Sequence, residues 1–223
     1  MSVPYGDRSA AGKALASALI AYRDRPDVVV LGLPRGGVPV AYEVAIALHV
    51  PLDVFAVRKI GVPGHEELAM GAVSADGTSV SFPTIVAAYA IEPKQFDAIL
   101  HREHAEAQRR ELAYRDSRVR PPLQDRTVIL VDDGLATGST MYAAVAALRE
   151  HHPRRIVVAV PVGATETCDM LRVHVDQIVC LVSPEPFHAV GLYYQNFGQT
   201  SDDEVRALLA DAYAREPHQW TSH

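Results

Sequence analysis

The sequence has few of the residues that mark secreted or membrane-bound proteins. Its 223 residues include only two cysteines, Cys168 and Cys180, which form no Cys-x-x-Cys arrangement and which we expect to be reduced. No run of about 18 apolar residues occurs, and the first residues have neither the apolar core nor the cleavage site of a signal peptide. We therefore expect a cytoplasmic protein that does not bind membranes.

Basic charge is also scarce. The 21 Lys and Arg residues are outnumbered by 27 Asp and Glu residues, and the formal net charge is −6. This balance argues against sequence-independent nucleic-acid binding, which needs a basic face that neutralises phosphates. No Gly-x-x-x-x-Gly-Lys-Ser/Thr run is present, so a P-loop is excluded. The 48% hydrophobic content is that of an ordinary globular protein.

Short β-branched runs alternate with amphipathic stretches, which predicts a doubly wound α/β fold with a mainly parallel sheet flanked by helices. The predicted strands are Val28–Leu33, Leu52–Val57, Val128–Val131, Ile156–Val160 and Ile178–Val182. The predicted helices are Ala10–Tyr22, Gly37–Leu48, Gly138–Glu150, Thr165–Val173 and Ser201–Arg215.

We expect one domain over residues 1–223, with a core at about 25–182, a helical insertion at about 71–125 and a small C-terminal hood at about 183–223. The insertion follows from the roughly seventy residues between the second and third predicted strands, more than a simple crossover needs. Gly71–Phe82 alternates Val with Gly and Ser, which predicts a β excursion. Pro93–Arg118 is rich in Glu, Arg, Ala and Gln, which predicts a long exposed helix.

The most informative stretch is Val128–Thr140, in which an apolar strand runs into two carboxylates and then into a turn of small residues. Such a turn lets backbone N–H groups close on an anion, and the next helix adds the positive end of its dipole. Asp132 and Asp133 would repel a bare phosphate, but carboxylates accept hydroxyl protons and bind hard cations. The stretch therefore predicts a ligand with a phosphate at one end and vicinal hydroxyls or hydrated Mg²⁺ at the other, such as ribose 5-phosphate. The alternative is a strand-to-helix turn that only caps a helix.

The apolar strand, the acidic pair and the Thr-Gly turn resemble the signature of the type I phosphoribosyltransferases, and the likeness extends over about residues 25–198. It implies an Mg²⁺-dependent enzyme that transfers ribose 5-phosphate from 5-phosphoribosyl 1-diphosphate (PRPP) to a nitrogen nucleophile, a nucleobase, and releases pyrophosphate. Asp132 and Asp133 would orient the ribose hydroxyls and bind the metal and its waters. The 5-phosphate would be bound by Ala136, Thr137, Gly138, Ser139 and Thr140.

A second Gly-rich turn, Leu33–Val38, follows the first predicted strand and predicts a second anion site at the same sheet edge. In the family this turn binds the pyrophosphate of PRPP, which implies that role for Pro34, Arg35, Gly36 and Gly37. Family members commonly have a non-proline cis peptide there, and the matching bond joins Pro34 to Arg35. The alternative is a glycine turn that only lets a helix pack closely.

Val57–Gly64 is similar to the Arg-Lys-x-Gly-x-x-Pro-Gly run of adenine phosphoribosyltransferases, and we expect it to continue through His65–Glu67 as a flexible loop. The likeness implies that Arg58 or Lys59 neutralises the departing pyrophosphate. The alternative is a pair of surface cations at the end of a strand.

Pro186–Gly191 is similar to the Phe-x-x-Val-Gly stretch with which hypoxanthine-guanine phosphoribosyltransferases sandwich a purine. It implies that Phe187, Tyr193 or Tyr194 stacks on the acceptor base. The acidic residue that those enzymes have after the glycine is replaced by Leu192, so purine specificity stays open. The alternative is that these rings only pack the hood.

Two other functions stay open. One is a PRPP- or nucleotide-sensing regulator that binds RNA or DNA through an arginine stripe formed by Arg109, Arg110, Arg115, Arg118 and Arg120. The other is a hydrolase that releases pyrophosphate to water. We also expect the protein to form a homodimer. The sequence does not identify the acceptor.

Overall fold

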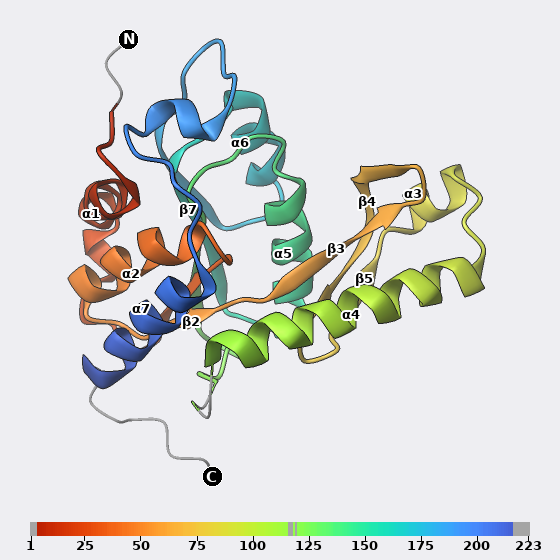
Figure 1. Cartoon of the computed structure of the whole chain (residues 1–223), viewed down its shortest axis with the longest axis horizontal. Helices are drawn as coiled ribbons and strands as arrows, with labels where there is room; N and C mark the ends of the chain where they lie inside the picture. Colours follow the sequence, from red (N-terminus) through yellow and green to blue (C-terminus); the bar gives the residue numbers. More distant parts are fainter. Residues whose placement is uncertain (1–3, 116–117, 119, 216–223) are drawn as a thin grey trace.

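The computed structural model describes residues 4–115, 118 and 120–215. Its core is a five-stranded parallel sheet with the order β2-β1-β6-β7-β8, flanked by helices on both faces (Figure 1). The strands are β1 (Val28–Gly32), β2 (Leu52–Val54), β6 (Thr127–Val131), β7 (Arg155–Val162) and β8 (Gln177–Val182). The helices around it are α1 (Arg8–Ala18), η1 (Ile20–Tyr22), α2 (Gly37–Leu48), α5 (Ser139–Arg149), α6 (Thr165–Arg172) and α7 (Asp202–Arg215). The predicted fold class is confirmed.

The central strands are apolar on both faces because helices cover both. Every residue of β1 and β6 is buried, as expected for a parallel sheet inside two helical layers. Val28 and Val30 of β1 pack with α1, α2 and α7, whereas Val29 and Leu31 pack with α5 and α6. Alternate residues of one strand therefore belong to two separate hydrophobic cores.

The strand register places the ends of the central strands at one edge of the sheet. Gly32 of β1 pairs with Val131 of β6, and Val162 of β7 pairs with Val182 of β8. The segments that follow these four strands therefore begin side by side, at the edge where open α/β sheets bind their ligands.

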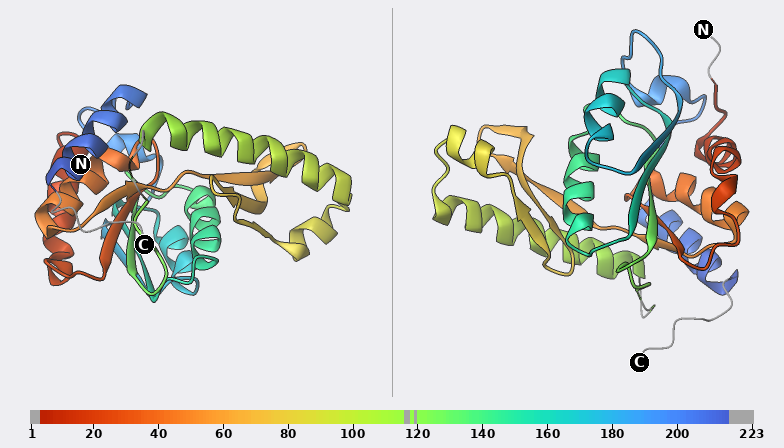
Figure 2. Two further views of the ribbon diagram at one scale, coloured as in Figure 1. Left: turned by 90° about the horizontal axis from the view of Figure 1, so that it is seen from below. Right: turned by 180° about the vertical axis from the view of Figure 1, so that it is seen from behind.

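The chain between β2 and β6 forms an arm that projects from the core (Figures 1 and 2). It contains an antiparallel sheet of β3 (Val57–Val62), β4 (His65–Ser74) and β5 (Ser79–Ser81), followed by α3 (Pro83–Ala88) and α4 (Pro93–Arg115). The arm has its own hydrophobic cluster, centred on Ile60, Val62, Met70 and Val73. It is therefore a packed unit and not a loop.

Three predictions about this region were wrong. The predicted strand Leu52–Val57 is two elements, because β2 ends at Val54 and Val57 begins a strand of the other sheet. The expected flexible loop from Val57 to Glu67 is instead the β3–β4 hairpin, which turns at Pro63 and Gly64. Gly64 has φ of 76°, the backbone region that favours glycine. The arm thus begins at residue 57 and not near residue 71, and the predicted β excursion Gly71–Phe82 comprises the end of β4 and β5.

The hood is also smaller than expected. Residues 183–200 form an irregular segment with one short helix, η2 (Val190–Tyr193), after β8. Helix α7 leaves this segment and packs beside α2 (Figure 1), where Val205 and Leu209 enter the core. Within the part of the chain that the structure describes, the hood therefore comprises residues 183–200.

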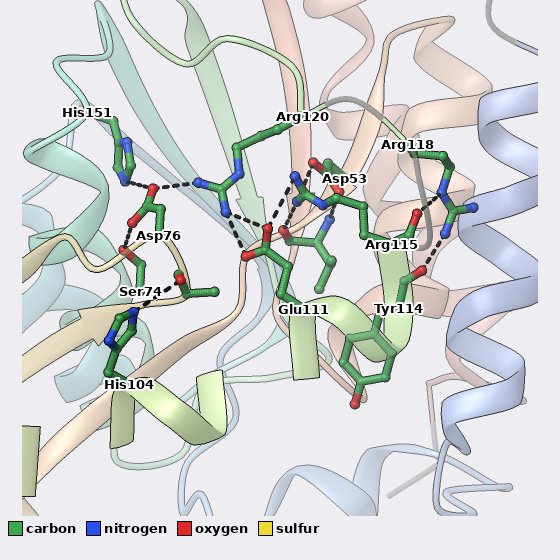
Figure 3. A network of polar contacts seen from close by, with 12 residues as sticks. Asp53, Ser74, Asp76, His104, Glu111, Tyr114, Arg115, Arg118, Arg120 and His151 are labelled. Carbon is green, nitrogen blue, oxygen red and sulfur yellow. Dashed lines mark hydrogen bonds and ion pairs between the residues drawn. The ribbon is translucent and has the colours of Figure 1, made fainter. Parts of the chain in front are cut away.

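A chain of charged side chains joins the arm to the core (Figure 3). It runs through Asp53, Arg115, Glu111, Arg120, Asp76 and His151. Arg115 of α4 lies 2.7 Å from Asp53 of β2, and each side chain is 10% exposed. Burial raises the pKa of Asp53 to about 6, although the Arg115 charge opposes this. Because both partners are desolvated, separating them would leave two buried charges unpaired. The pair therefore holds the C-terminal end of α4 against the sheet.

Asp76 of the arm has the opposite pKa shift and gives a testable prediction. Burial favours a higher pKa, but hydrogen bonds from the Ser74 hydroxyl and the Thr78 N–H, together with Arg120 and His151, lower the pKa of Asp76 well below its usual value. We expect Asp76→Asn to lower the free energy of unfolding by about 1–3 kcal/mol near pH 7. A carboxyl with a lowered folded pKa stabilises above its unfolded pKa near 4, and this contribution is lost as the pH falls through the folded pKa.

Urea unfolding of wild type and Asp76→Asn near pH 7 and near pH 3 measures this effect. The difference between the two proteins should shrink at the lower pH. An equal difference at both pH values would show that the negative charge of Asp76 does not anchor the arm.

No helix within residues 4–115, 118 and 120–215 is both long enough and apolar enough to cross a bilayer.

Candidate functional site

The two turns predicted to bind anions are in direct contact at the carboxyl edge of the sheet. The Leu33 N–H donates to the Val131 carbonyl over 2.9 Å, just before the β1–α2 turn (residues 34–37). A Cβ on Gly36 would lie 2.1 Å from Asp133 Oδ2, and one on Gly37 would lie 2.7 Å from the Val131 carbonyl oxygen. The β1–α2 turn therefore lies against the acidic pair: a side chain at Gly36 would displace the Asp133 carboxylate, and one at Gly37 would displace backbone at the end of β6. The peptide bond between Pro34 and Arg35 is cis, so that prediction is confirmed.

Asp132 and Asp133 form a pair of adjacent carboxyls. The Asp133 N–H donates to Asp132 Oδ1 over 2.9 Å. Burial and then the Asp133 charge raise the pKa of Asp132 well above its usual value. Burial also raises the pKa of Asp133, although the nearby Arg8 opposes this. Two desolvated negative charges side by side favour a hydroxyl donor or a cation as a partner.

Arg8 is the main residue of this site that the sequence did not reveal. Its Nε and Nη2 nitrogens lie 2.9 and 2.8 Å from Asp133 Oδ2. Its Nη1 donates to the Gly198 carbonyl over 2.7 Å, and its guanidinium lies 4.0 Å from the centre of the Phe197 ring. In the sequence, Arg8 is one arginine at the start of a helix, and such an arginine gives no functional signal. Only the fold brings it to a residue 125 positions away.

The β6–α5 turn has the backbone of an anion-binding helix start. Gly138 precedes α5 with φ of 72°, and the first N–H groups of a helix have no partners within the helix. The Thr167 hydroxyl of α6 donates to the Ala136 carbonyl over 2.6 Å, and its methyl carbon would lie 2.4 Å from a Cβ on Gly138. Thr137 and Ser139 bring their hydroxyls within 3.3 Å of each other at the mouth of the turn. Ala136, Thr137 and Thr140 are exposed.

Arg35 of the β1–α2 turn faces the first residue of α7. Its Nη1 lies 3.7 Å from Asp202 Oδ1, and the Tyr114 hydroxyl of α4 donates to the same oxygen over 2.9 Å. The arm helix and α7 thus meet beside this turn.

The structure places Arg58 and Lys59 on β3 of the arm. Arg58 is 2.9 Å from Glu103 of α4, and Lys59 is 2.8 Å from Glu67 on the neighbouring strand. Both cations already have carboxylate partners within the arm. Their proposed action on pyrophosphate stays a prediction.

The hood places its aromatic residues in two different settings. Tyr194 is only 5% exposed; its ring packs on Tyr5, and its hydroxyl donates to the Asp133 carbonyl over 2.6 Å. The Tyr194 ring is thus part of the support beneath the acidic pair and is not open for stacking. Phe187 and Tyr193 stack on each other, with ring centres 5.7 Å apart, and both are half-buried.

Phe187 also lines an open pocket of about 640 Å³ between the segments that follow β7 and β8. The other lining residues are Ala164, Thr165, Glu166, Pro184, Glu185 and Pro186. The pocket is next to the β6–α5 turn in the sheet, because Leu135 and Gly163 form a parallel β-bridge. A flat ligand bound there would have an aromatic ring on one side.

The arginines of the candidate nucleic-acid stripe have partners within the chain. Arg109 and Arg110 both pair with Glu106, whereas Arg115 is buried against Asp53. Arg118 donates to two backbone carbonyls, and Arg120 bridges Asp76 and Glu111. Each arginine of the stripe is therefore already paired with a carboxylate or a backbone carbonyl of the chain.

The acidic pair also fits a small hard cation. Among the described residues, no group of three or more His, Cys, Asp or Glu side chains is arranged to hold a metal. Mg²⁺ commonly binds through one or two carboxylates together with waters and substrate phosphates. Arg8 supplies one positive charge to the two carboxylates, so a net negative charge remains when both are ionised. Asp132 and Asp133 are the residues that would bind the ion.

Comparison with known proteins points to one family. A model of the phosphoribosyl transferase domain matches residues 6–195. A Mycobacterium tuberculosis protein, described provisionally as a phosphoribosyl transferase, is 46% identical over 209 residues, which are 94% of this chain and 47% of that protein. The chain thus spans about half the length of this relative. The crystal structure of TT1426 from Thermus thermophilus superimposes with a TM-score of 0.85 at 42% identity, and the match covers 93% of this chain and 98% of that one. The chain belongs to the type I phosphoribosyltransferase family.

Proposed function

We propose that this protein is a phosphoribosyltransferase that transfers ribose 5-phosphate from PRPP to a nucleobase-like nitrogen nucleophile and releases pyrophosphate. The observation that supports this most directly is the contact between the two turns. Gly36 of one turn lies directly against Asp133 of the other, so two anion-binding backbones flank a pair of carboxyls. PRPP has the matching order of groups: a 5-phosphate, two ribose hydroxyls and a diphosphate.

In this proposal each part of the edge binds one part of PRPP. Residues 136–140 bind the 5-phosphate through backbone N–H groups, and Asp132 and Asp133 accept the ribose hydroxyl protons. The β1–α2 turn with Arg35 binds the diphosphate. Arg58 and Lys59 are further candidates for the leaving-group charge, but they would first have to exchange their partners Glu103 and Glu67.

The chemical step requires positioning and charge stabilisation rather than a covalent enzyme intermediate. Displacement at the ribosyl carbon passes through an oxocarbenium-like state, as in other glycosyl transfers. Bound Mg²⁺ would supply positive charge to the diphosphate. In this proposal Asp132 and Asp133 hold the ribose, and the two turns hold the phosphate groups on either side of it. The expected homodimer stays a prediction.

A screen for pyrophosphate release tests this function. Purified protein with PRPP and Mg²⁺ is assayed against each nucleobase and without a base. Base-dependent release supports the transferase, whereas equal release without any base identifies the hydrolase. PRPP binding without release, coupled to RNA or DNA binding, would instead identify the sensor.

The acceptor side gives a separate prediction. We expect Phe187→Ala to raise the acceptor KM about ten-fold, because stacking on a base contributes about 1–3 kcal/mol. Tyr193→Ala should have a smaller effect, since Tyr193 stacks on Phe187 and supports its ring. Calorimetry with PRPP should give wild-type affinity for both variants.

Phe82→Ala is a matched control, because Phe82 is also half-buried against an aromatic ring, that of Tyr142, and does not line the pocket. If Phe187→Ala and Tyr193→Ala keep wild-type acceptor kinetics, these rings only pack the hood, and the acceptor binds elsewhere.

A further inference from the structure

Arg8 connects three separate parts of the chain at the candidate site. It is the first residue of α1, it pairs with Asp133 after β6, and it donates to the Gly198 carbonyl in the hood. A Cβ on Gly36 would lie 3.4 Å from Arg8 Nε, so the guanidinium also borders the β1–α2 turn. Arg8 is therefore at the point where the acidic pair, the β1–α2 turn and the hood meet.

The contacts of Arg8 use the whole guanidinium group. Two of its nitrogens face a single oxygen, Asp133 Oδ2, and the third faces a backbone carbonyl. Its flat face lies on the Phe197 ring, which itself packs against Tyr194 with ring centres 5.0 Å apart. A planar, permanently charged group with several fixed donors fits this position, and a lysine would reproduce only the charge.

An ordinary surface ion pair would have little effect on function, because exposed pairs contribute about 0–1 kcal/mol and are screened by salt. The Arg8 and Asp133 side chains are only 13% and 15% exposed. Their charges are therefore poorly screened, and the position of Arg8 affects every charged group that approaches the pair. The Arg8 charge acts on Asp132 as well, because the Asp132 carboxylate lies beside Asp133 and accepts a hydrogen bond from the Asp133 N–H.

The ligand in the proposed function makes this charge important. PRPP has phosphates at both ends and would bind beside two carboxylates that lie against the β1–α2 turn. A cation fixed on one of them reduces the repulsion without occupying either turn. The same cation also reduces the attraction of the pair for a metal ion, because both positive charges compete for Asp133.

We propose that Arg8 is a positioning residue and an internal counter-ion for the acidic pair: it holds Asp133 in place, lets PRPP approach when metal is limiting, and weakens the binding of free Mg²⁺. This inference rests on the proposed function. It assigns to the first turn of α1 a role in substrate binding, although α1 precedes the first strand of the core.

Calorimetry on purified full-length protein tests the proposal with two titrants, Mg²⁺ alone and PRPP at a low and a high Mg²⁺ concentration. For Arg8→Gln we expect Mg²⁺ alone to bind about ten-fold more tightly than to wild type. We expect PRPP to bind about ten-fold more weakly at low Mg²⁺ and to approach wild-type affinity at high Mg²⁺, because the metal then replaces the missing charge. A variant that has lost its fold would bind PRPP weakly at every Mg²⁺ concentration, so the recovery of PRPP affinity at high Mg²⁺ separates this role from a structural one.

Two further variants make the test specific. Arg8→Lys keeps the charge, so it should bind Mg²⁺ as wild type does and lose only part of the PRPP affinity. Arg25→Gln is the matched control: Arg25 also directs two nitrogens at one carboxylate, that of Asp27, and lies over the Tyr22 ring. That pair precedes β1, at the opposite edge of the sheet, so both titrations should be unchanged.

Three results would overturn the proposal. One is wild-type Mg²⁺ and PRPP binding by Arg8→Gln. Another is equal behaviour of Arg8→Gln and Arg8→Lys, because the charge would then be irrelevant. The third applies if Arg8→Gln does not fold: it is the finding that Arg8→Lys binds PRPP with wild-type affinity. Failure of the proposed function is distinguishable, because it shows in the wild type, which would then either not bind PRPP or bind it without transfer to a base, whereas the titration with Mg²⁺ alone would still report on Arg8.

Discussion

Asp132→Asn is expected to lower kcat/KM by at least about 100-fold while the protein stays folded. The amide keeps the size of the side chain but cannot act as an anionic acceptor, and loss of a preorganised charge commonly costs about 10²–10³ in rate. Burial and the Asp133 charge raise the pKa of Asp132, so its ionised form is disfavoured by folding near neutral pH. The variant should therefore be as stable as wild type or more stable.

Steady-state kinetics and urea unfolding near pH 7 check both parts of this expectation. Asp169→Asn is the control for loss of one negative charge, because Asp169 is exposed on α6 and pairs with Arg172 of the same helix. Near-normal turnover by Asp132→Asn would place the substrate hydroxyls elsewhere. Lost activity together with lost stability would indicate a structural carboxylate.

Gly37→Ala is expected to weaken PRPP binding at least about ten-fold. The added methyl carbon would lie 2.7 Å from the Val131 carbonyl oxygen and 2.9 Å from the Asp132 Cα, and neither backbone atom can move without shifting the end of β6. Overpacking of this kind costs about 1–3 kcal/mol. Because the strain falls on the joint between the two turns, we expect it to change the spacing of the two phosphate sites.

Calorimetry with PRPP and thermal unfolding measure the two effects of Gly37→Ala. Gly6→Ala is the matched control, because no atom lies within 4 Å of the Cβ position at Gly6. Wild-type PRPP affinity in Gly37→Ala would mean that the contact between the turns is not needed for binding.

The site was predictable where its signal is local. Asp132, Asp133 and the small residues after them lie within one strand–turn–helix segment, so their order alone indicates a phosphate and hydroxyl site. Likewise, the β-branched runs predicted the core strands, because a strand covered on both faces is mostly apolar.

The rest depends on contacts that periodicity does not encode. The segment from Leu52 to Val57 looks like one strand, because apart from Asp53 it stays apolar while the chain moves from one hydrophobic core to another. Asp53 looks misplaced in a strand until Arg115 of the arm helix reaches it. Arg8 acts on Asp133 and Gly198, which are both far away in the sequence.

The wide sequence separation of the site's contacts also affects the order in which parts of the protein fold during synthesis. The Arg8 guanidinium bonds to the Gly198 carbonyl, which is 190 positions later in the chain. At about 5–20 residues per second, roughly 10–40 s separate the synthesis of these two residues. Contacts so distant in sequence form slowly, since a long loop must close first. The nascent chain can therefore bury much of its sheet before any substrate site exists, and binding competence should be the last property to return in a refolding experiment.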